Sequence, residues 1–132
     1  MKSIHTAIMI IVVLLFATSV IGGEDPNFFK ETYPTHALKG TLEARKTLNG
    51  PDAQLDAKTR ELISLGVAAQ IPCSYCVYIH KKNARAAGAS EAEIREAVAA
   101  AAETRHWSTV LNGMDYDLED FKAEVDKIHS TK

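Results

Sequence analysis

Beyond residue 23 the chain repeats its apolar residues at helical spacing, and no stretch alternates apolar with polar residues between turn signals. Strict alternation marks a half-buried strand, whereas an apolar residue every three to four positions is typical of an amphipathic helix. Residues with β-branched side chains are also sparse in this region. The sequence therefore predicts an all-α protein.

Capping and stop signals divide this region into helices. Asp56 is a good N-cap, Ser90 and Glu93 form a capping box, and Gly88 suits a left-handed C-cap. Asn49, Gly50 and Pro51 in succession end an earlier helix. The expected helices cover about residues 35–48, 56–70, from 72 or 73 to 88, 90–112 and 117–129, with residues 24–34 as an irregular lead-in.

Three of these helices carry packing expectations. The helix over 56–70 has almost no polar face, so we expect it to be central and buried. The run Ala97–Ala102 lacks bulk and favours a close helix contact. The last helix carries an apolar stripe that we expect to dock on the bundle; its members are Leu118, Phe121, Val125 and Ile128.

The first residues are typical of an export signal. Lys2 precedes an apolar run from Ala7 to Ile21, which small residues follow. The run is shorter than the roughly 20 residues that a membrane-spanning helix needs, which favours cleavage over a permanent anchor. We therefore expect a signal peptide over 1–22 and a single domain over 23–132, periplasmic or secreted, that meets a membrane only through the export segment.

The net charge and the number of cysteines exclude two classes of protein. Fifteen Lys and Arg residues against 17 Asp and Glu residues give a net charge of -2, so no basic field exists to attract nucleic acid. The 2 cysteines are too few for a disulfide-dense secreted scaffold. Whatever chemistry they perform, they perform it as one pair.

That pair begins a helix and shares a face with a histidine. At 100° per residue, Cys73, Cys76 and His80 fall on one side of the helix, and Lys82 and Arg85 fall away from it. The partial positive charge at a helix N-terminus stabilises a thiolate, and a histidine one turn later can take or relay the proton.

Glu61 extends this constellation from the preceding helix. It lies ten residues before Ile71 and His80 lies nine after, so an antiparallel pairing of the two helices sets them level. A carboxylate there can orient His80 and hold its tautomer, as a proton relay requires.

Two other interpretations fit the same residues. A Cys-x-x-Cys in an exported protein can serve as a structural clip, although its short loop constrains the unfolded chain little. Cys73, Cys76, His80 and Glu61 also have the side chains of a zinc site, but their spacing is not that of a standard finger.

Glu61, the Cys73-Ser74-Tyr75-Cys76 motif and His80, in a helical chain with Gly88 and the Ser90 capping box, resemble the AhpD-like alkylhydroperoxidase family. That family lies within the carboxymuconolactone decarboxylase superfamily, whose decarboxylase members lack the paired cysteines. The resemblance covers about residues 35–113. It implies an AhpD-like helical bundle, a homo-oligomer (trimer or hexamer), and reduction of an organic hydroperoxide or hydrogen peroxide without metal or organic cofactor.

The resemblance also implies roles for the site residues. Cys76 attacks the peroxide, Cys73 resolves the product as an intramolecular disulfide, and Glu61 with His80 forms the relay that deprotonates Cys76. The helix N-terminus alone favours Cys73 as the more acidic thiol, but His80 is the i+4 neighbour of Cys76. Tyr75 departs from the best-known members, which have another histidine between the cysteines.

The predicted export of the protein leaves its electron donor unidentified. Some family members are reduced by lipoylated cytosolic partners, which an exported protein does not meet, so the dithiol reductant is unknown. A second hypothesis is therefore an exported protein that exchanges thiols and disulfides with other proteins and has little peroxidase activity.

Overall fold

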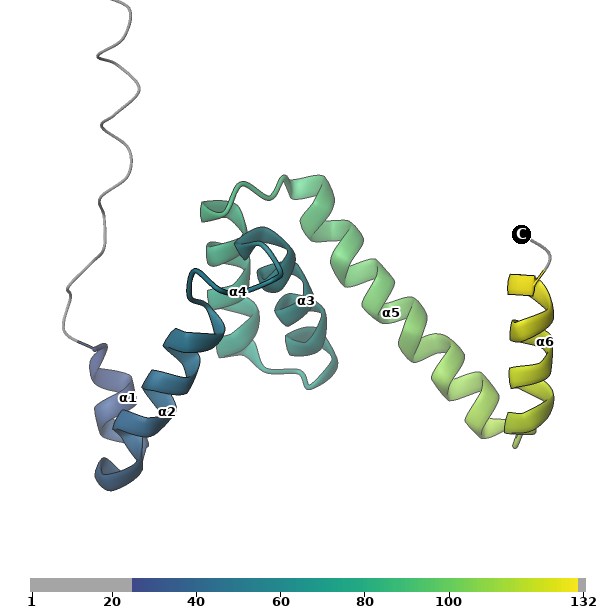
Figure 1. The fold of residues 1–132 in the computed structure, drawn as a ribbon, viewed down its shortest axis with the longest axis horizontal. Helices are drawn as coiled ribbons and strands as arrows, with labels where there is room; N and C mark the ends of the chain where they lie inside the picture. The colour runs from purple at the N-terminus through teal and green to yellow at the C-terminus, as the bar shows by residue number, and fades with distance from the viewer. Residues whose placement is uncertain (1–24, 131–132) are drawn as a thin grey trace, which may run out of the picture. The chain divides into compact units, whose positions relative to one another are not determined.

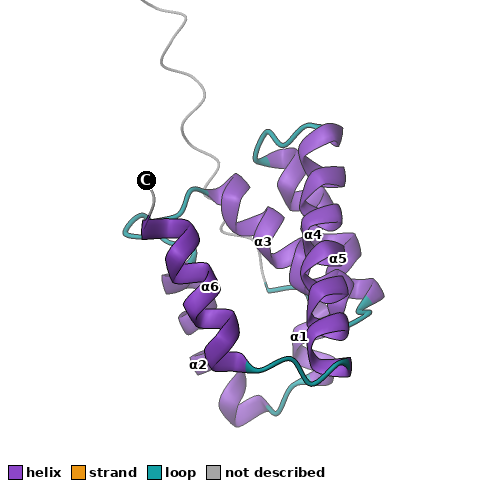
Figure 2. Ribbon diagram, turned by 90° about the vertical axis from the view of Figure 1, so that its right-hand side faces the viewer, coloured by secondary structure: helices purple, strands orange, loops and turns teal. Residues whose placement is uncertain are grey.

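The computed structural model of the protein describes residues 25–130 (Figure 1). Figure 2 shows that this part of the chain consists of helices and loops, without a strand, so the all-α prediction is confirmed. No helix within it is long and apolar enough to cross a membrane. The helices are α1 (Asn27–Thr32), α2 (Thr35–Leu48), α3 (Ala57–Gln70), α4 (Ser74–Ala86), α5 (Glu91–Gly113) and α6 (Leu118–Ser130).

The predicted signal peptide, residues 1–22, lies outside the described residues. The chain divides into two compact units, one ending at Lys46 and the other beginning at Thr47. The organisation of residues 23–132 as one domain stays a prediction.

Within the first unit, the expected irregular lead-in is wrong, because Asn27–Thr32 form helix α1. Pro26 restricts its own φ angle to -53° directly before the first turn, which favours a helix start. The rings of Phe28 and Phe29 pack with centroids 4.3 Å apart, and the Arg45 guanidinium of α2 lies 5.8 Å from the Phe29 ring centroid. The Arg45 contact joins α1 to α2.

In the second unit the predicted caps are confirmed. Asp56 Oδ1 accepts the Thr59 N–H at 2.9 Å at the start of α3. Ser90 and Glu93 form the reciprocal capping box of α5, with bonds of 3.1 and 2.7 Å. Gly88 follows α4 with a φ of +87°, which only glycine adopts without steric cost.

Helix α3 is central, as expected, since it packs against both α4 and α5. Leu65 of α3 is 1% exposed and anchors a small core with three residues from the neighbouring segments: Ala84, Ala89 and Ile94. The expectation that α3 is buried throughout is wrong for this chain. Ile63 and Val67 are each more than half exposed, because α4 and α5 leave one side of α3 uncovered.

The small residues of α5 bring it close to α3, as predicted from Ala97–Ala102. A Cβ placed on Gly66 would lie 3.4 Å from the Ala101 Cβ and 3.7 Å from the Ala97 carbonyl oxygen. The Gln70 side-chain amide donates to the Ala101 carbonyl oxygen across the same seam. An added Cβ at position 66 would therefore make ordinary van der Waals contact with α5, which shows how closely the two helices approach.

The prediction that α6 docks on the bundle is wrong. Within the described second unit, α6 packs against none of α3, α4 and α5, and it lies apart from α3 and α4 in Figure 1. Leu118 and Phe121 of its stripe are 61% and 40% exposed. The stripe shows that one side of α6 is suited to burial, but no other helix of the described second unit covers it.

Candidate functional site

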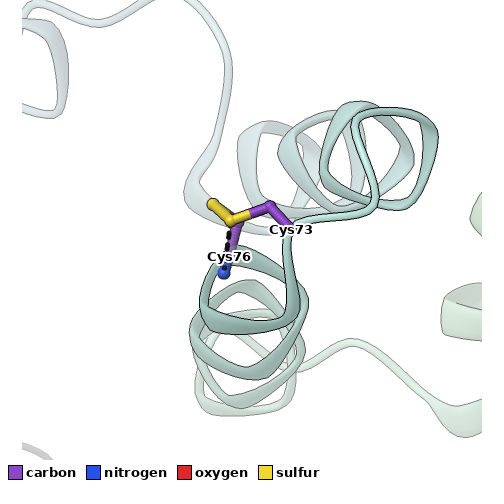
Figure 3. The surroundings of a disulfide bond; sticks show 2 residues. All are labelled: Cys73 and Cys76. Carbon is purple, nitrogen blue, oxygen red and sulfur yellow. Dashed lines mark hydrogen bonds between the residues drawn. A yellow bond between two sulfur atoms is a disulfide. The ribbon is translucent and has the colours of Figure 1, made fainter.

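The candidate site starts at the turn between α3 and α4. The Cys73 N–H donates to the Ala68 carbonyl oxygen at 3.1 Å, which places Cys73 at the N-cap of α4. Its Sγ accepts the Cys76 N–H at 3.2 Å, the bond drawn in Figure 3. Cys73 and Cys76 form a disulfide with their Cα atoms 5.2 Å apart. The cysteine pair therefore lies within the first turn of a helix, where the helix dipole favours a thiolate after reduction.

The residues predicted to share one face of α4 differ in burial from those predicted to lie on its other sides. Cys73, Cys76 and His80 are all partly buried, whereas Lys82 and Arg85 are exposed on other sides of the helix. The same face continues into the core through Ala84, which is fully buried. The packing of α4 on α3 brings the imidazole on this face to the seam between the two helices.

Glu61 and His80 meet across that seam, as the antiparallel register predicts. Glu61 Oε2 lies 2.7 Å from His80 Nδ1, and the two side chains are only 18% and 29% exposed. With Nδ1–H donating to the carboxylate, Nε2 is left as the proton acceptor of the ring. This carboxylate–imidazole pair has the arrangement of an oriented general base.

Asn83 is a third member of this cluster that the sequence reasoning missed. Its side-chain amide donates to Glu61 Oε1 at 3.3 Å, so both carboxylate oxygens of Glu61 have partners on α4. A signal was available, since Asn83 lies seven residues after Cys76 and therefore on the same face. Asn83 holds the carboxylate in the orientation that faces His80.

An ion pair near the start of α3 supports the position of Glu61. Lys58 Nζ lies 2.7 Å from Glu93 Oε1, which ties the first turn of α3 to the first turn of α5. The Lys58 side chain, together with the Ser90 backbone N–H, lowers the pKa of Glu93 to about 2. Because Glu61 follows Lys58 by one turn, this clamp fixes the end of α3 that carries the carboxylate.

The zinc interpretation finds no support in residues 25–130. No three histidine, cysteine, aspartate or glutamate side chains among them come together as metal ligands. Both cysteine sulfur atoms are already joined in the disulfide. The arrangement of a dithiol pair, an imidazole and a carboxylate instead fits thiol chemistry with proton transfer.

Comparison with known proteins places this chain in a family. A model of the carboxymuconolactone decarboxylase family matches residues 36–117. The chain belongs to the carboxymuconolactone decarboxylase family. Among the solved structures of similar proteins is the alkylhydroperoxidase AhpD core from Rhodospirillum rubrum ATCC 11170, with a TM-score of 0.60 and 33% identity. That match covers 65% of this chain and 64% of the Rhodospirillum rubrum chain, and it confirms the AhpD-like fold.

A curated relative of this carboxymuconolactone decarboxylase family member is the uncharacterized protein 4 in the cox locus of Paracoccus denitrificans. The two sequences are 43% identical over 54 residues, which is 41% of this chain. The chain spans about half the length of that relative, 49%. Family members include decarboxylases as well as alkylhydroperoxidases, so the choice between activities depends on the residues of the site.

Proposed function

We propose that this protein is a thiol-dependent hydroperoxide reductase that cycles Cys73 and Cys76 between dithiol and disulfide. The observation that carries the proposal is the Glu61–His80 pair, whose atoms are 2.7 Å apart, with His80 one helical turn after Cys76. The similarity of the chain to the alkylhydroperoxidase AhpD core from Rhodospirillum rubrum supports the same conclusion. The Cys73–Cys76 pair, which the decarboxylase members of the superfamily lack, favours the peroxidase over a decarboxylase.

The reaction begins with the reduced protein. Cys76 gives its proton to His80 Nε2 while Glu61 stabilises the imidazolium that forms. The Cys76 thiolate attacks one peroxide oxygen, so that an S–O bond forms and the O–O bond breaks. The alkoxide leaves with the proton from His80 as an alcohol, and Cys76 becomes a sulfenic acid.

The second half of the cycle returns the protein to its oxidised form. The Cys73 thiolate attacks Cys76 Sγ, an S–S bond forms, and the S–O bond breaks. Hydroxide leaves and becomes water with the Cys73 proton. One hydroperoxide and the dithiol thus yield one alcohol, one water and the disulfide, which an external dithiol then reduces. This chemistry requires no metal and no organic cofactor.

The assignment of Cys76 as the attacking thiol has its own test. His80 follows Cys76 by one turn, and Cys73 is occupied as the N-cap of α4. The Cys73→Ser variant should accumulate a sulfenic acid on treatment with peroxide, and the Cys76→Ser variant should form none. The opposite pattern contradicts the assignment.

Thiol-disulfide exchange with a protein partner is the second candidate. Tyr75, between the cysteines, is 89% exposed, and Ile71 just before them is 61% exposed. Exposed apolar side chains beside a disulfide offer a surface to another protein. This function predicts fast reaction with protein dithiols and slow reaction with hydroperoxides.

One experiment separates the two candidates. The fully reduced protein is mixed with an organic hydroperoxide, quenched with an alkylating reagent, and followed by mass spectrometry for the Cys73–Cys76 disulfide. A rate far above that of a free thiol supports the peroxidase. A rate equal to that of free cysteine rejects it in favour of disulfide exchange.

We also propose that the protein is exported, on the strength of Lys2 and the apolar run from Ala7 to Ile21. N-terminal sequencing of the protein recovered from the periplasm or medium tests this. A first residue near position 23 supports cleavage of a signal peptide. Recovery only from the cytoplasm with Met1 intact contradicts it.

A further inference from the structure

Helix α4 is apolar on its outer side as well as on the side that it buries. Tyr75, Tyr78 and Ile79 are 89%, 63% and 42% exposed. Together with Lys82 they recur at intervals of three and four residues, so the four side chains share one side of the helix, the outer face of α4. The opposite side packs into the core through Ala84. Because a surface helix ordinarily carries polar residues outside, the outer face of α4 is suited to contact with another molecule.

The outer face of α4 borders the disulfide. Tyr75 directly precedes Cys76, and Ile79 follows Cys76 by three residues, so both are its neighbours on the helix surface. Ile71, two residues before Cys73, is a further apolar residue beside the pair and is 61% exposed. The two cysteines are only partly buried. A molecule bound at the outer face of α4 is therefore within reach of the disulfide.

The disulfide needs an electron donor from outside the chain. Cys73 and Cys76 are the 2 cysteines of the sequence, and both are in the disulfide, so no third thiol of this chain can open the bond by exchange. Hydroperoxide reduction and disulfide exchange both require an external thiol at this step. The inference below rests on the proposed redox cycle of the two cysteines, but not on a peroxide as the oxidant.

Lys82 gives the outer face of α4 a positive charge. Its Nζ lies 5.3 Å from the Tyr78 ring centroid, and it makes no ion pair with any of residues 25–130. Helix α4 also carries Lys81 and Arg85 but no aspartate or glutamate. Arg85 already pairs with Glu91 at 2.6 Å. Lys82 is thus left to attract a carboxylate from another molecule.

We propose that the outer face of α4 is the docking surface for the protein that reduces the Cys73–Cys76 disulfide. The partner is a dithiol protein that carries apolar side chains and a carboxylate beside its thiols. Its apolar side chains pack on the two tyrosine rings and Ile79, and its carboxylate pairs with Lys82. A small hydrophilic thiol makes neither contact.

Reduction by this partner proceeds through a mixed disulfide. A thiolate of the partner attacks one sulfur of the Cys73–Cys76 pair, so that an S–S bond to the partner forms and the bond within the pair breaks. The other cysteine leaves with the electron pair and takes a proton. The second thiolate of the partner then attacks the partner's own sulfur in the mixed disulfide and releases the remaining cysteine, which takes the second proton. The partner is oxidised to a disulfide, and the pair becomes a dithiol.

The test measures how fast three reductants reduce the full-chain protein in its disulfide form. Two are synthetic peptides, each with a Cys-x-x-Cys pair flanked by leucines, with glutamates beside the leucines in one peptide and lysines in the other. The third is dithiothreitol, which needs no docking surface and reports the reactivity of the disulfide itself. Alkylation followed by mass spectrometry gives the rate of dithiol formation.

Two variants alter the outer face of α4, and each has a matched control. Ile79→Ser removes an apolar side chain that is 42% exposed, and its control Val110→Ser removes one on α5 that is 40% exposed. Lys82→Glu reverses the charge beside Tyr78. Its control Lys122→Glu makes the same charge change on α6, which does not pack against α4.

We expect the glutamate peptide to reduce the parent protein at least about threefold faster than the lysine peptide does, and about 1 M salt should remove this preference. Ile79→Ser should slow reduction by both peptides, and Lys82→Glu should reverse their order. The two controls should react as the parent does. Dithiothreitol should reduce the parent, the variants and the controls at the same rate.

Any of three results overturns the proposal. One is a parent protein that the two peptides reduce equally fast. Another is a pair of variants that keep the parent rates; if Ile79→Ser also lowers the mass found by sedimentation equilibrium, a second copy of the chain covers the outer face of α4. The third is a slowing with dithiothreitol as large as with the peptides, since the change then lies in the disulfide and not in docking.

The peroxidase proposal fails or stands on a different measurement, the oxidation of the reduced protein by hydroperoxide. A slow oxidation rejects the peroxidase and leaves the peptide rates unaffected. Equal peptide rates reject the docking surface and leave the oxidation rate unaffected.

Discussion

Replacing Glu61 with glutamine removes the negative charge that faces His80 Nδ1 at 2.7 Å and keeps the size of the side chain. A hydrogen bond to a charged group contributes about 1.5–3 kcal/mol and a neutral one about 0.5–1.5 kcal/mol. The variant should therefore lose about 1–2 kcal/mol of the stabilisation of the imidazolium that forms when Cys76 is deprotonated. Since a factor of ten in rate corresponds to about 1.4 kcal/mol, oxidation of Cys76 should slow by about 5- to 30-fold.

The assay is the single-turnover oxidation of the reduced protein by excess organic hydroperoxide, with the disulfide quantified by mass spectrometry after alkylation. Glu91→Gln is the matched control, because it also removes a paired carboxylate, the one 2.6 Å from Arg85, but lies outside the site. The control should react at the parent rate. A Glu61→Gln protein that is as fast as the parent, or a control that is equally slow, refutes the proposed relay.

Three further predictions follow from contacts in the second unit. Asn83→Ala removes the 3.3 Å hydrogen bond to Glu61 and should slow the same oxidation by about 2- to 10-fold; an unchanged rate shows that Asn83 does not position the carboxylate. Leu65→Ala empties the largest fully buried position and should lower the free energy of unfolding in urea by about 2.7–5 kcal/mol; a loss under 1 kcal/mol contradicts the assigned core. Lys58 and the Ser90 N–H lower the pKa of Glu93 to about 2 from its ordinary value of 4.5. The stabilisation from this carboxylate is therefore complete above about pH 4.5 and is lost as the pH falls toward 2. The thermal midpoint should fall over that range less in Glu93→Gln than in the parent, and parallel curves contradict the clamp.

The helix boundaries that the sequence predicts well are those set by local hydrogen bonds. Asp56, Ser90 and Gly88 act through residues close in the chain, so their side chains or backbone angles determine where α3 and α5 begin and α4 ends. Helix α1 was missed because it begins at Pro26, without a side-chain cap, and the Phe29 ring contacts Arg45 of α2. A contact between two helices leaves no local pattern in the sequence.

The part of the candidate site that follows from residue counting was also predictable from the sequence. The register of two helices joined by a short turn follows from counting residues, which placed Glu61 level with His80. Asn83 was not predicted as a site residue, because an asparagine on a helix beside lysines and an arginine is usually solvated. Only its contact with Glu61 in the structure shows its place in the site. The prediction that α6 is buried against the bundle was wrong for a different reason. An apolar stripe shows that one side of a helix is suited to burial, but it does not show which surface covers that side.

The capping of α4 by a disulfide sulfur affects how the site can be probed. Cys73 Sγ accepts the Cys76 N–H at 3.2 Å, so one sulfur atom of the disulfide also completes the first turn of the helix. The backbone amide resonance of Cys76 is therefore a direct reporter of the state of the pair. Serine is among the strongest helix caps and alanine among the weakest. Cys73→Ser removes the sulfur and keeps α4 capped, whereas Cys73→Ala also frays the turn that holds Cys76.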